Sequence, residues 1–126
     1  MLKIIMLIII TISLSIKSFA ANLACSDNLG GFCTYTGKIE RVYVNDNNLI
    51  LIYFESPLSS SEVSKSGLNV TKYEAAAYKL TDNPDFAKLF YSTALTAQST
   101  QKTISIQMYD VLSGYLKFDR IWLNPQ

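Results

Sequence analysis

The chain has 126 residues, with two cysteines, no histidine, and 11 Lys and Arg against 10 Asp and Glu. This length allows one domain. The lack of histidine excludes imidazole bases, Ser-His-Asp triads and His-bound metals, and two cysteines are too few for a zinc–thiolate cluster. The near-zero net charge argues against a nucleic-acid binder. We therefore expect no catalytic residue, no metal and no cofactor.

Residues 1–21 have the pattern of a secretory signal peptide. Lys3 precedes a nearly unbroken apolar run that ends before Lys17, and Ser18-Phe19-Ala20 fits an A-x-A-like cleavage site. The apolar run is shorter than the roughly 20 residues that span a bilayer, which favours a signal peptide over an uncleaved membrane anchor. We expect a mature domain of residues 22–126 that is secreted or periplasmic and has no membrane span.

The two cysteines fit a structural disulfide. Export places Cys25 and Cys33 in an oxidising compartment, and Gly30 and Gly31 let the short loop between them turn tightly. A redox or nucleophilic thiol would need a nearby His or a Cys-x-x-Cys spacing, and a lipidated Cys25 would lie closer to the apolar run. We predict a disulfide that closes an irregular N-terminal segment over residues 22–35.

Residues 37–55 read as two β-strands joined by a turn at Asn45 to Asn48. A two-residue loop at Asp46 and Asn47 sets the register, which pairs Val44 with Leu49, Val42 with Leu51 and Lys38 with Glu55. Both faces of this hairpin are apolar, whereas a hairpin with one solvated face alternates apolar and polar residues. We therefore expect the second face to be covered, either within a strongly curved barrel or by another subunit.

The remaining elements follow in chain order. A serine-rich exposed loop is expected over 56–72, a strand over 73–80, a helix from the cap signal at Asn83-Pro84 to about Gln98, and strands over 102–109 and 116–123. The apolar stripe predicted for the helix comprises Phe86, Leu89, Phe90, Ala94 and Ala97. In the last strand we expect three side chains to point inward: Leu116, Phe118 and Trp122.

Five strands with one helix between the third and fourth have the layout of an OB-fold, a five-stranded Greek-key barrel in the mainly β class. Two stretches support this interpretation, namely residues 84–109 (PDFAKLFYSTALTAQSTQKTISIQMY) and the run Tyr35-Thr36-Gly37-Lys38-Ile39. They resemble the corresponding parts of the binding (B) subunits of bacterial AB5 toxins, of the subtilase cytotoxin and typhoid toxin type. The likeness covers residues 35–123.

This resemblance implies a non-catalytic secreted subunit that forms a homopentameric ring, recognises a cell-surface glycan and delivers a toxin A subunit, and hence a role in virulence. It places glycan binding at Tyr35 and Thr36, where a hydroxyl bonds the sugar and an aromatic face covers the apolar side of the ring. The chain departs from the family in having its cysteines only before the barrel and in lacking a Trp-rich loop after the fourth strand.

Two other functions remain open at this point. The alternative is a secreted or periplasmic OB-fold protein that binds a protein partner, as an inhibitor or an envelope accessory factor. A glycosidase-like enzyme would need two carboxylates several ångströms apart, such as Glu40 and Asp119. Exposed acids on strands are ordinarily solvated, which argues against the enzyme.

Overall fold

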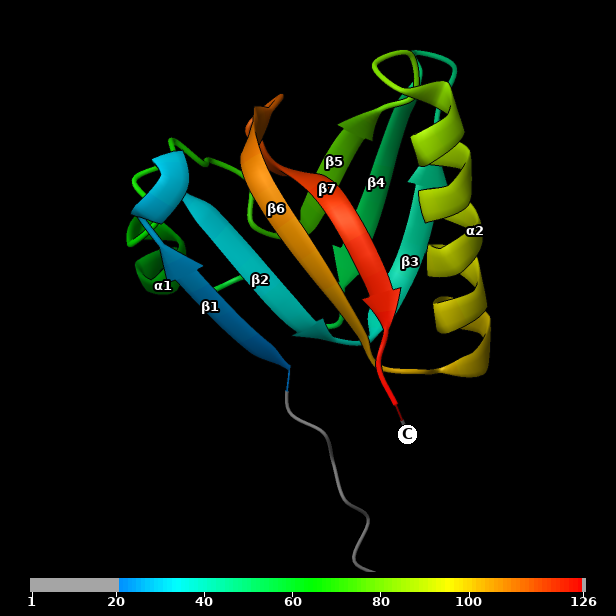
Figure 1. The fold of residues 1–126 in the computed structure, drawn as a ribbon, viewed down its shortest axis with the longest axis horizontal. Helices are drawn as coiled ribbons and strands as arrows, with labels where there is room; N and C mark the ends of the chain where they lie inside the picture. The colour runs from blue at the N-terminus through cyan, green and yellow to red at the C-terminus, as the bar shows by residue number, and fades with distance from the viewer. Residues whose placement is uncertain (1–20, 126) are drawn as a thin grey trace, which may run out of the picture.

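The computed structural model describes residues 21–125, and the predicted signal peptide lies outside them except for Ala21. Seven strands form one mixed sheet in the order β1-β2-β6-β7-β5-β4-β3 (Figure 1). The strands are β1 (Asn22–Ser26), β2 (Phe32–Gly37), β3 (Ile39–Val44), β4 (Leu49–Phe54), β5 (Ala75–Lys79), β6 (Ile104–Leu112) and β7 (Tyr115–Leu123). The helices are α1 (Ser60–Ser64) and α2 (Pro84–Thr100), with a short 3₁₀ turn at Asn28–Gly30.

The predicted five-stranded OB-fold barrel with one helix is wrong, although the mainly β character is confirmed. The sheet is open, because β1 and β3 are edge strands that do not pair with each other. Closure of a barrel requires every strand to have two neighbours. The prediction failed in the N-terminal half, where residues 22–37 form the β1–β2 hairpin instead of an irregular segment. It also missed α1, which occupies the serine-rich region expected to be a loop.

The β3–β4 turn is longer than predicted. The backbone N–H of Asn45 donates to the carbonyl of Leu49, and the Asn45 side chain accepts from the N–H groups of Asn47 and Leu49. Asn48 takes a positive φ of 62°, which Asn tolerates well. Val44 therefore lies opposite Ile50 and not Leu49.

The start of the same ladder is also irregular. Ile39 lies opposite Phe54, and a β-bulge follows between Ile39 and Arg41. The pairing of Ile39 with Phe54 follows the predicted register, and the predicted pair of Lys38 and Glu55 lies just outside the ladder because β3 begins at Ile39 and β4 ends at Phe54. One extra residue in one strand shifts every later pairing, and the sequence pattern alone did not reveal it.

Helix α2 begins and ends close to the predicted residues. The side chain of Asn83 caps its first turn by accepting from the N–H of Phe86, and Gln101 ends it in the left-handed conformation at φ 56°. The predicted apolar stripe is partly wrong, because Leu89 is 71% exposed. The buried side of α2 consists of Ala87, Phe90, Ala94 and Ala97.

The main core lies between α2 and the inner side of the sheet. Phe90 of α2 stacks on Phe118 of β7 with ring centroids 3.7 Å apart, and Tyr78 of β5 stacks on the same Phe118. The inward side chains of β6 are buried as predicted, namely Ile104, Ile106 and Met108. In Figure 1, α2 runs beside β3 and β7, whereas α1 lies next to β1 at the other end of the sheet.

The β4 part of the second apolar face of the β3–β4 hairpin is covered by the same chain. Leu51 on this face is only 4% exposed and packs with Ala75 and Ala77 of β5 and with Tyr115 of β7. Tyr43 of β3, opposite Leu51, stays 43% exposed. The apolar character of the β4 part is thus explained within one subunit.

Candidate functional site

The two residues predicted to bind a glycan point to opposite sides of the sheet. Successive side chains of a strand alternate between its faces, and Tyr35 and Thr36 are neighbours on β2. Tyr35 is 2% exposed, its ring lies 4.2 Å from that of Phe54, and its hydroxyl donates to the carbonyl of Lys38 at 2.8 Å. Burial, with a smaller effect of the Glu55 carboxylate, raises the pKa of Tyr35 to about 12. The Tyr35 ring belongs to the core, and Thr36 alone reaches the surface.

Thr36 lies in a row of side chains that crosses four neighbouring strands. The register places Asn22 of β1 opposite Thr36, Thr36 opposite Ser105 of β6, and Ser105 opposite Trp122 of β7. Directly opposite residues of antiparallel strands share one face. The hydroxyls of Thr36 and Ser105 share a hydrogen bond at 3.1 Å, and the Asn124 amide donates to Ser105 at 3.1 Å. The row is therefore ordered by hydrogen bonds within the chain.

A second row runs parallel to the first. It contains Ala24, Thr34, Gln107 and Arg120, and a third contains Ser26, Phe32 and Tyr109. We call the outward side of β1, β2, β6 and β7 the open face. Its larger polar and aromatic side chains are Thr34, Thr36, Ser105, Gln107, Tyr109, Arg120 and Trp122.

Trp122 is the single tryptophan of the chain and is 43% exposed on the open face. We predicted that it points inward together with Leu116 and Phe118, and this is wrong for Trp122 alone. The β6–β7 ladder shifts register between Gln107 and Met108, because β7 has one extra residue between Phe118 and Arg120. The extra residue reverses the alternation of the side chains that follow it, so Trp122 points outward and not inward.

One end of the open face is aromatic and charged. The Arg120 guanidinium lies 5.7 Å from the centre of the Tyr109 ring, and the Tyr109 and Phe32 rings lie 5.5 Å apart. Arg120 also contacts Asp119 at 3.3 Å. The other carboxylate oxygen of Asp119, Oδ1, is the one buried side-chain polar atom in residues 21–125 that lacks a hydrogen-bond partner.

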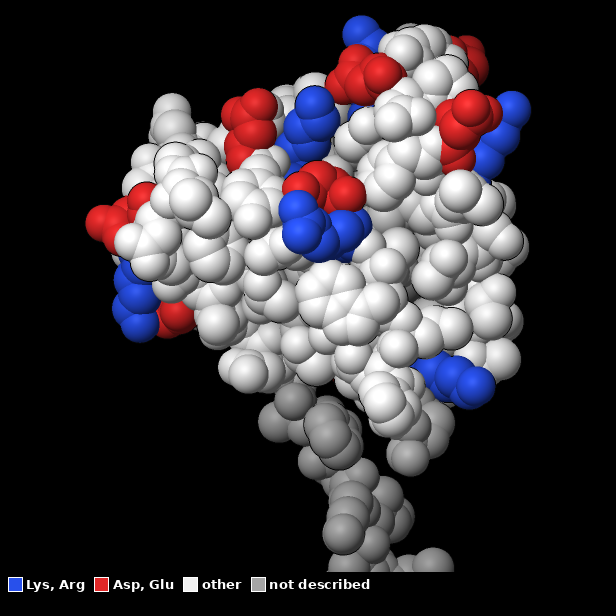
Figure 2. Space-filling model, in the orientation of Figure 1, with Lys and Arg blue, Asp and Glu red and all other residues white. Residues whose placement is uncertain are grey.

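Charge is sparse over the open face. Figure 2, drawn in the orientation of Figure 1, shows one mixed cluster of acidic and basic side chains near the centre and a broad uncharged area below it. Trp122 lies opposite Ser105, whose hydroxyl bonds the Thr36 hydroxyl and the Asn124 amide. Within residues 21–125, no three His, Cys, Asp or Glu side chains lie close enough together to hold a metal ion. The open face thus offers hydrogen bonds and an aromatic plane.

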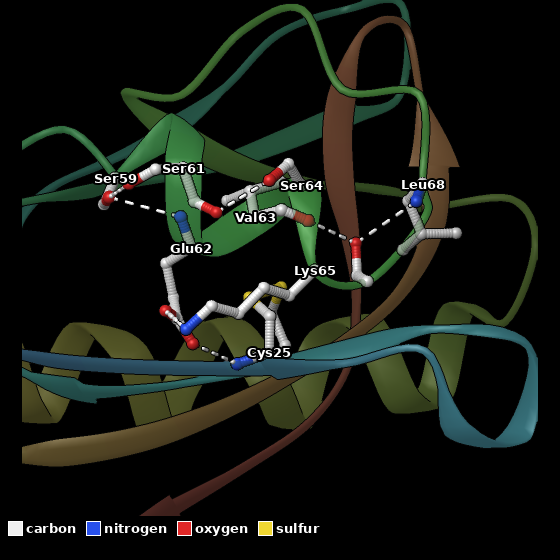
Figure 3. Close-up of a disulfide and its surroundings, with 10 residues drawn as sticks. Cys25, Ser59, Ser61, Glu62, Val63, Ser64, Lys65 and Leu68 are labelled. Carbon is white, nitrogen blue, oxygen red and sulfur yellow. Dashed lines mark hydrogen bonds and ion pairs between the residues drawn. A yellow bond between two sulfur atoms is a disulfide. The ribbon is translucent and has the colours of Figure 1, made fainter.

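The predicted disulfide is confirmed. Cys25 and Cys33 lie directly opposite each other on β1 and β2, with bonded sulfurs. Figure 3 shows that α1 lies against this bond and that Glu62 reaches β1, where it accepts from the N–H of Cys25 at 3.1 Å. A 2.6 Å ion pair with Lys65, and then the Cys25 N–H, lower the pKa of Glu62. The disulfide and Glu62 fasten β1 to the rest of the domain.

The sequence analysis found Thr36 and missed most of its neighbours on the open face. The alternation of residues 103–108 separates Ser105 and Gln107 from the buried isoleucines, and this signal was available. No sequence signal placed Trp122 beside Ser105, because that pairing depends on the bulge between Gln107 and Met108.

No protein-family model, curated protein or solved structure matches this chain. The likeness to AB5 toxin binding subunits therefore stays a prediction from the sequence motifs. None of the helices within residues 21–125 is both long enough and apolar enough to cross a membrane.

Proposed function

We propose that this chain is a non-catalytic carbohydrate-binding protein and that the open face holds the sugar. The observation that carries the proposal is the row in which Thr36, Ser105 and Trp122 lie side by side on three adjacent strands. Rigid strands hold these groups in place before a ligand arrives, so little order has to be created on binding.

The chemistry of the row matches that of a sugar. A pyranose has an apolar side that packs on an aromatic plane, and Trp122 offers such a plane at the surface. The sugar hydroxyls both donate and accept, as do the hydroxyl of Thr36 and the amide of Gln107, while the buried Ser105 hydroxyl holds Thr36 and Asn124 in place. Each hydrogen bond adds about 0.5–1.5 kcal/mol net. Two such bonds and one stacked ring correspond to dissociation constants of roughly millimolar to tens of millimolar.

Export of the chain is part of the proposal. The predicted signal peptide and the Cys25–Cys33 disulfide both favour an oxidising compartment outside the cytosol. The proposal includes neither a ring nor a toxin. Leu51, on the apolar hairpin face that suggested a ring, is covered by Tyr115 of the same chain.

A glycan array tests the proposal, with Trp122→Ala and Thr36→Ala as variants. Tyr91→Ala is a matched control, because Tyr91 is also a partly exposed aromatic residue, 37% exposed, but lies on α2. We expect array signals for the wild type and Tyr91→Ala and loss of signal for both open-face variants. Absence of any glycan signal for the wild type, or equal loss in Tyr91→Ala, would contradict the proposal.

A protein partner is the second candidate function, and an exposed apolar pair on α2 favours it. Tyr91 and Leu95, four residues apart on one side of this helix, are 37% and 42% exposed. Exposed aliphatic and aromatic side chains at this spacing are typical of helix-mediated contacts. Under this function the Leu95→Lys variant loses binding to the partner, whereas Leu89→Lys, on another side of α2, and Trp122→Ala keep it.

A further inference from the structure

The edge strand β3 has unpaired backbone groups. The N–H of Phe54 donates to the carbonyl of Glu74, and that of Leu80 donates to the carbonyl of Asn48, so the even-numbered residues of β4 point their N–H and C=O groups toward β5. The odd-numbered residues of β4 therefore form their backbone hydrogen bonds with β3, as the bond from the Asn45 N–H to the Leu49 carbonyl shows.

The register then identifies the free groups of β3. Tyr43 lies opposite Leu51 and Arg41 opposite Tyr53, and these pairs are hydrogen-bonded. Val42 and Val44 lie opposite Ile52 and Ile50, so their N–H and C=O groups point away from the sheet. Within residues 21–125 these groups have no other backbone partner.

The opposite edge of the sheet is closed. Cys25 and Cys33 are directly paired, and the Cys25 N–H points outward, where the Glu62 carboxylate accepts it (Figure 3). Helix α1 packs beside β1 and holds Glu62 there through its ion pair with Lys65. The Glu62 carboxylate occupies the outward N–H of β1 and so prevents a further strand from pairing there. Pairing of β3 with β1 of another copy, which would build a ring or a filament, is blocked.

The free edge is complementary to itself. Val42 and Val44 alternate with Tyr43, so an antiparallel copy centred on Tyr43 places Val42 opposite the Val44 of the other copy and pairs all of their free groups. In this register Glu40 lies opposite Asp46 of the other copy, so charge does not favour the pairing, and the backbone hydrogen bonds and apolar contacts carry it.

Exposed apolar surface continues from this edge. Tyr43 and Val44 are 43% and 49% exposed, which is high for large apolar residues at an edge strand. A cavity of about 220 Å³ adjoins Val44 between β3 and α2, with Ile50, Lys88 and Tyr91 among its lining residues. A second copy on the edge would remove part of this surface from water.

We propose that two copies of this chain associate through antiparallel β3–β3 pairing, with a two-fold axis at Tyr43. The two sheets become one continuous sheet, and Tyr43 of each copy faces Tyr43 of the other. The open face lies on the far strands β1, β2, β6 and β7, so this dimer is independent of sugar binding.

Sedimentation velocity of the full mature chain tests the dimer. We expect a dimer for the wild type and for the control Leu89→Lys, which carries the same change at a 71% exposed site on α2. In Val44→Lys, the charge at the edge raises the dimer dissociation constant by roughly tenfold or more. A wild type that is monomeric at millimolar concentration, or one that forms larger rings, would overturn the proposal.

A cysteine trap tests the register. Directly opposite residues of a pair without hydrogen bonds have Cα atoms about 4.5 Å apart, within the range that a disulfide spans. Because both native cysteines are bonded to each other, Tyr43→Cys introduces one free thiol. We expect rapid oxidation of Tyr43→Cys to a covalent dimer and slow oxidation of Leu89→Cys; equal rates would overturn the register.

Amide exchange of the wild type supplies a readout that needs no variant. The N–H groups of Val42 and Val44 should become protected as the protein concentration rises, while that of Cys25 stays protected throughout. Fast exchange of Val42 and Val44 at every concentration would refute the pairing even if Val44→Lys failed to fold.

Discussion

Removal of the disulfide is a direct test of how the N-terminal hairpin is held. Cys25 and Cys33 are separated by 8 residues, and closing so short a loop lowers the entropy of the unfolded chain. The chain-entropy relation converts this loop length into about 2.5 kcal/mol of stability at 25 °C. For a domain of this size that corresponds to a fall in Tm of roughly 10–20 °C.

Urea unfolding of a Cys25→Ala, Cys33→Ala double variant measures this loss. The wild type in a reducing agent is the matched control, because its chain is the same except for the bond, and it should unfold at nearly the same urea concentration as the double variant. Equal unfolding midpoints for the oxidised wild type and the double variant would refute the reasoning. A variant far less stable than the reduced wild type would show that alanine disrupts the packing of Cys33, which is fully buried.

Three further predictions concern single side chains. Phe90→Ala should lower the free energy of unfolding by about 3–5 kcal/mol, because it removes a buried ring stacked on Phe118; a loss below 1 kcal/mol in urea unfolding would contradict this packing. Glu62 has a pKa below its ordinary value of 4.5, so its contribution to stability is present above pH 4.5 and is lost as the pH falls through the lowered pKa. Glu62→Gln should therefore be less stable than the wild type at neutral pH and equally stable in strong acid, and a gap that persists in acid would count against the ion pair. Tyr35 should ionise near pH 12 in the folded chain, so stability falls as the pH rises from 10 toward 12; a phenolate absorbance titration that shows every tyrosine near pH 10 would place Tyr35 outside the core.

Local sequence signals predicted the elements whose pattern is short-range. The cap at Asn83, with Pro84 in the first turn, located the start of α2, and the alternation of residues 103–108 located the buried side of β6. The turn chemistry of residues 45–48 located the β3–β4 hairpin. Its register was off by one residue, because a longer turn and a shorter turn fit the same asparagine-rich stretch.

Long-range pairing was the part that the sequence did not reveal. The alternation of Cys33 and Tyr35 with Thr34 and Thr36 is visible in the sequence, but residues 22–26 show no such pattern. The pairing of β1 with β2 becomes apparent only once the disulfide is known to join directly opposite residues. The open face depends on the same pairing, which brings Thr36 next to Ser105 although 69 residues separate them.

The position of Tyr35 and Thr36 shows the limit of carrying a site over from a resemblance. The motif predicted an aromatic residue and a hydroxyl at one pocket, yet neighbouring residues on a strand cannot share a face. The aromatic plane beside Thr36 comes from Trp122, across β6. The proposed sugar site therefore rests on the Trp122 ring beside Thr36, in place of the Tyr35 ring that the motif predicted.

Chemical-shift mapping of the labelled mature protein with the glycan that gives the strongest array signal tests the central claim most directly. The open face predicts that the largest shifts occur at the amides of Thr36, Ser105 and Gln107 and at the indole N–H of Trp122, and that Trp122→Ala abolishes them. Shifts centred instead on α2 or on the Tyr43, Tyr53 and Tyr115 side of the sheet would contradict the account.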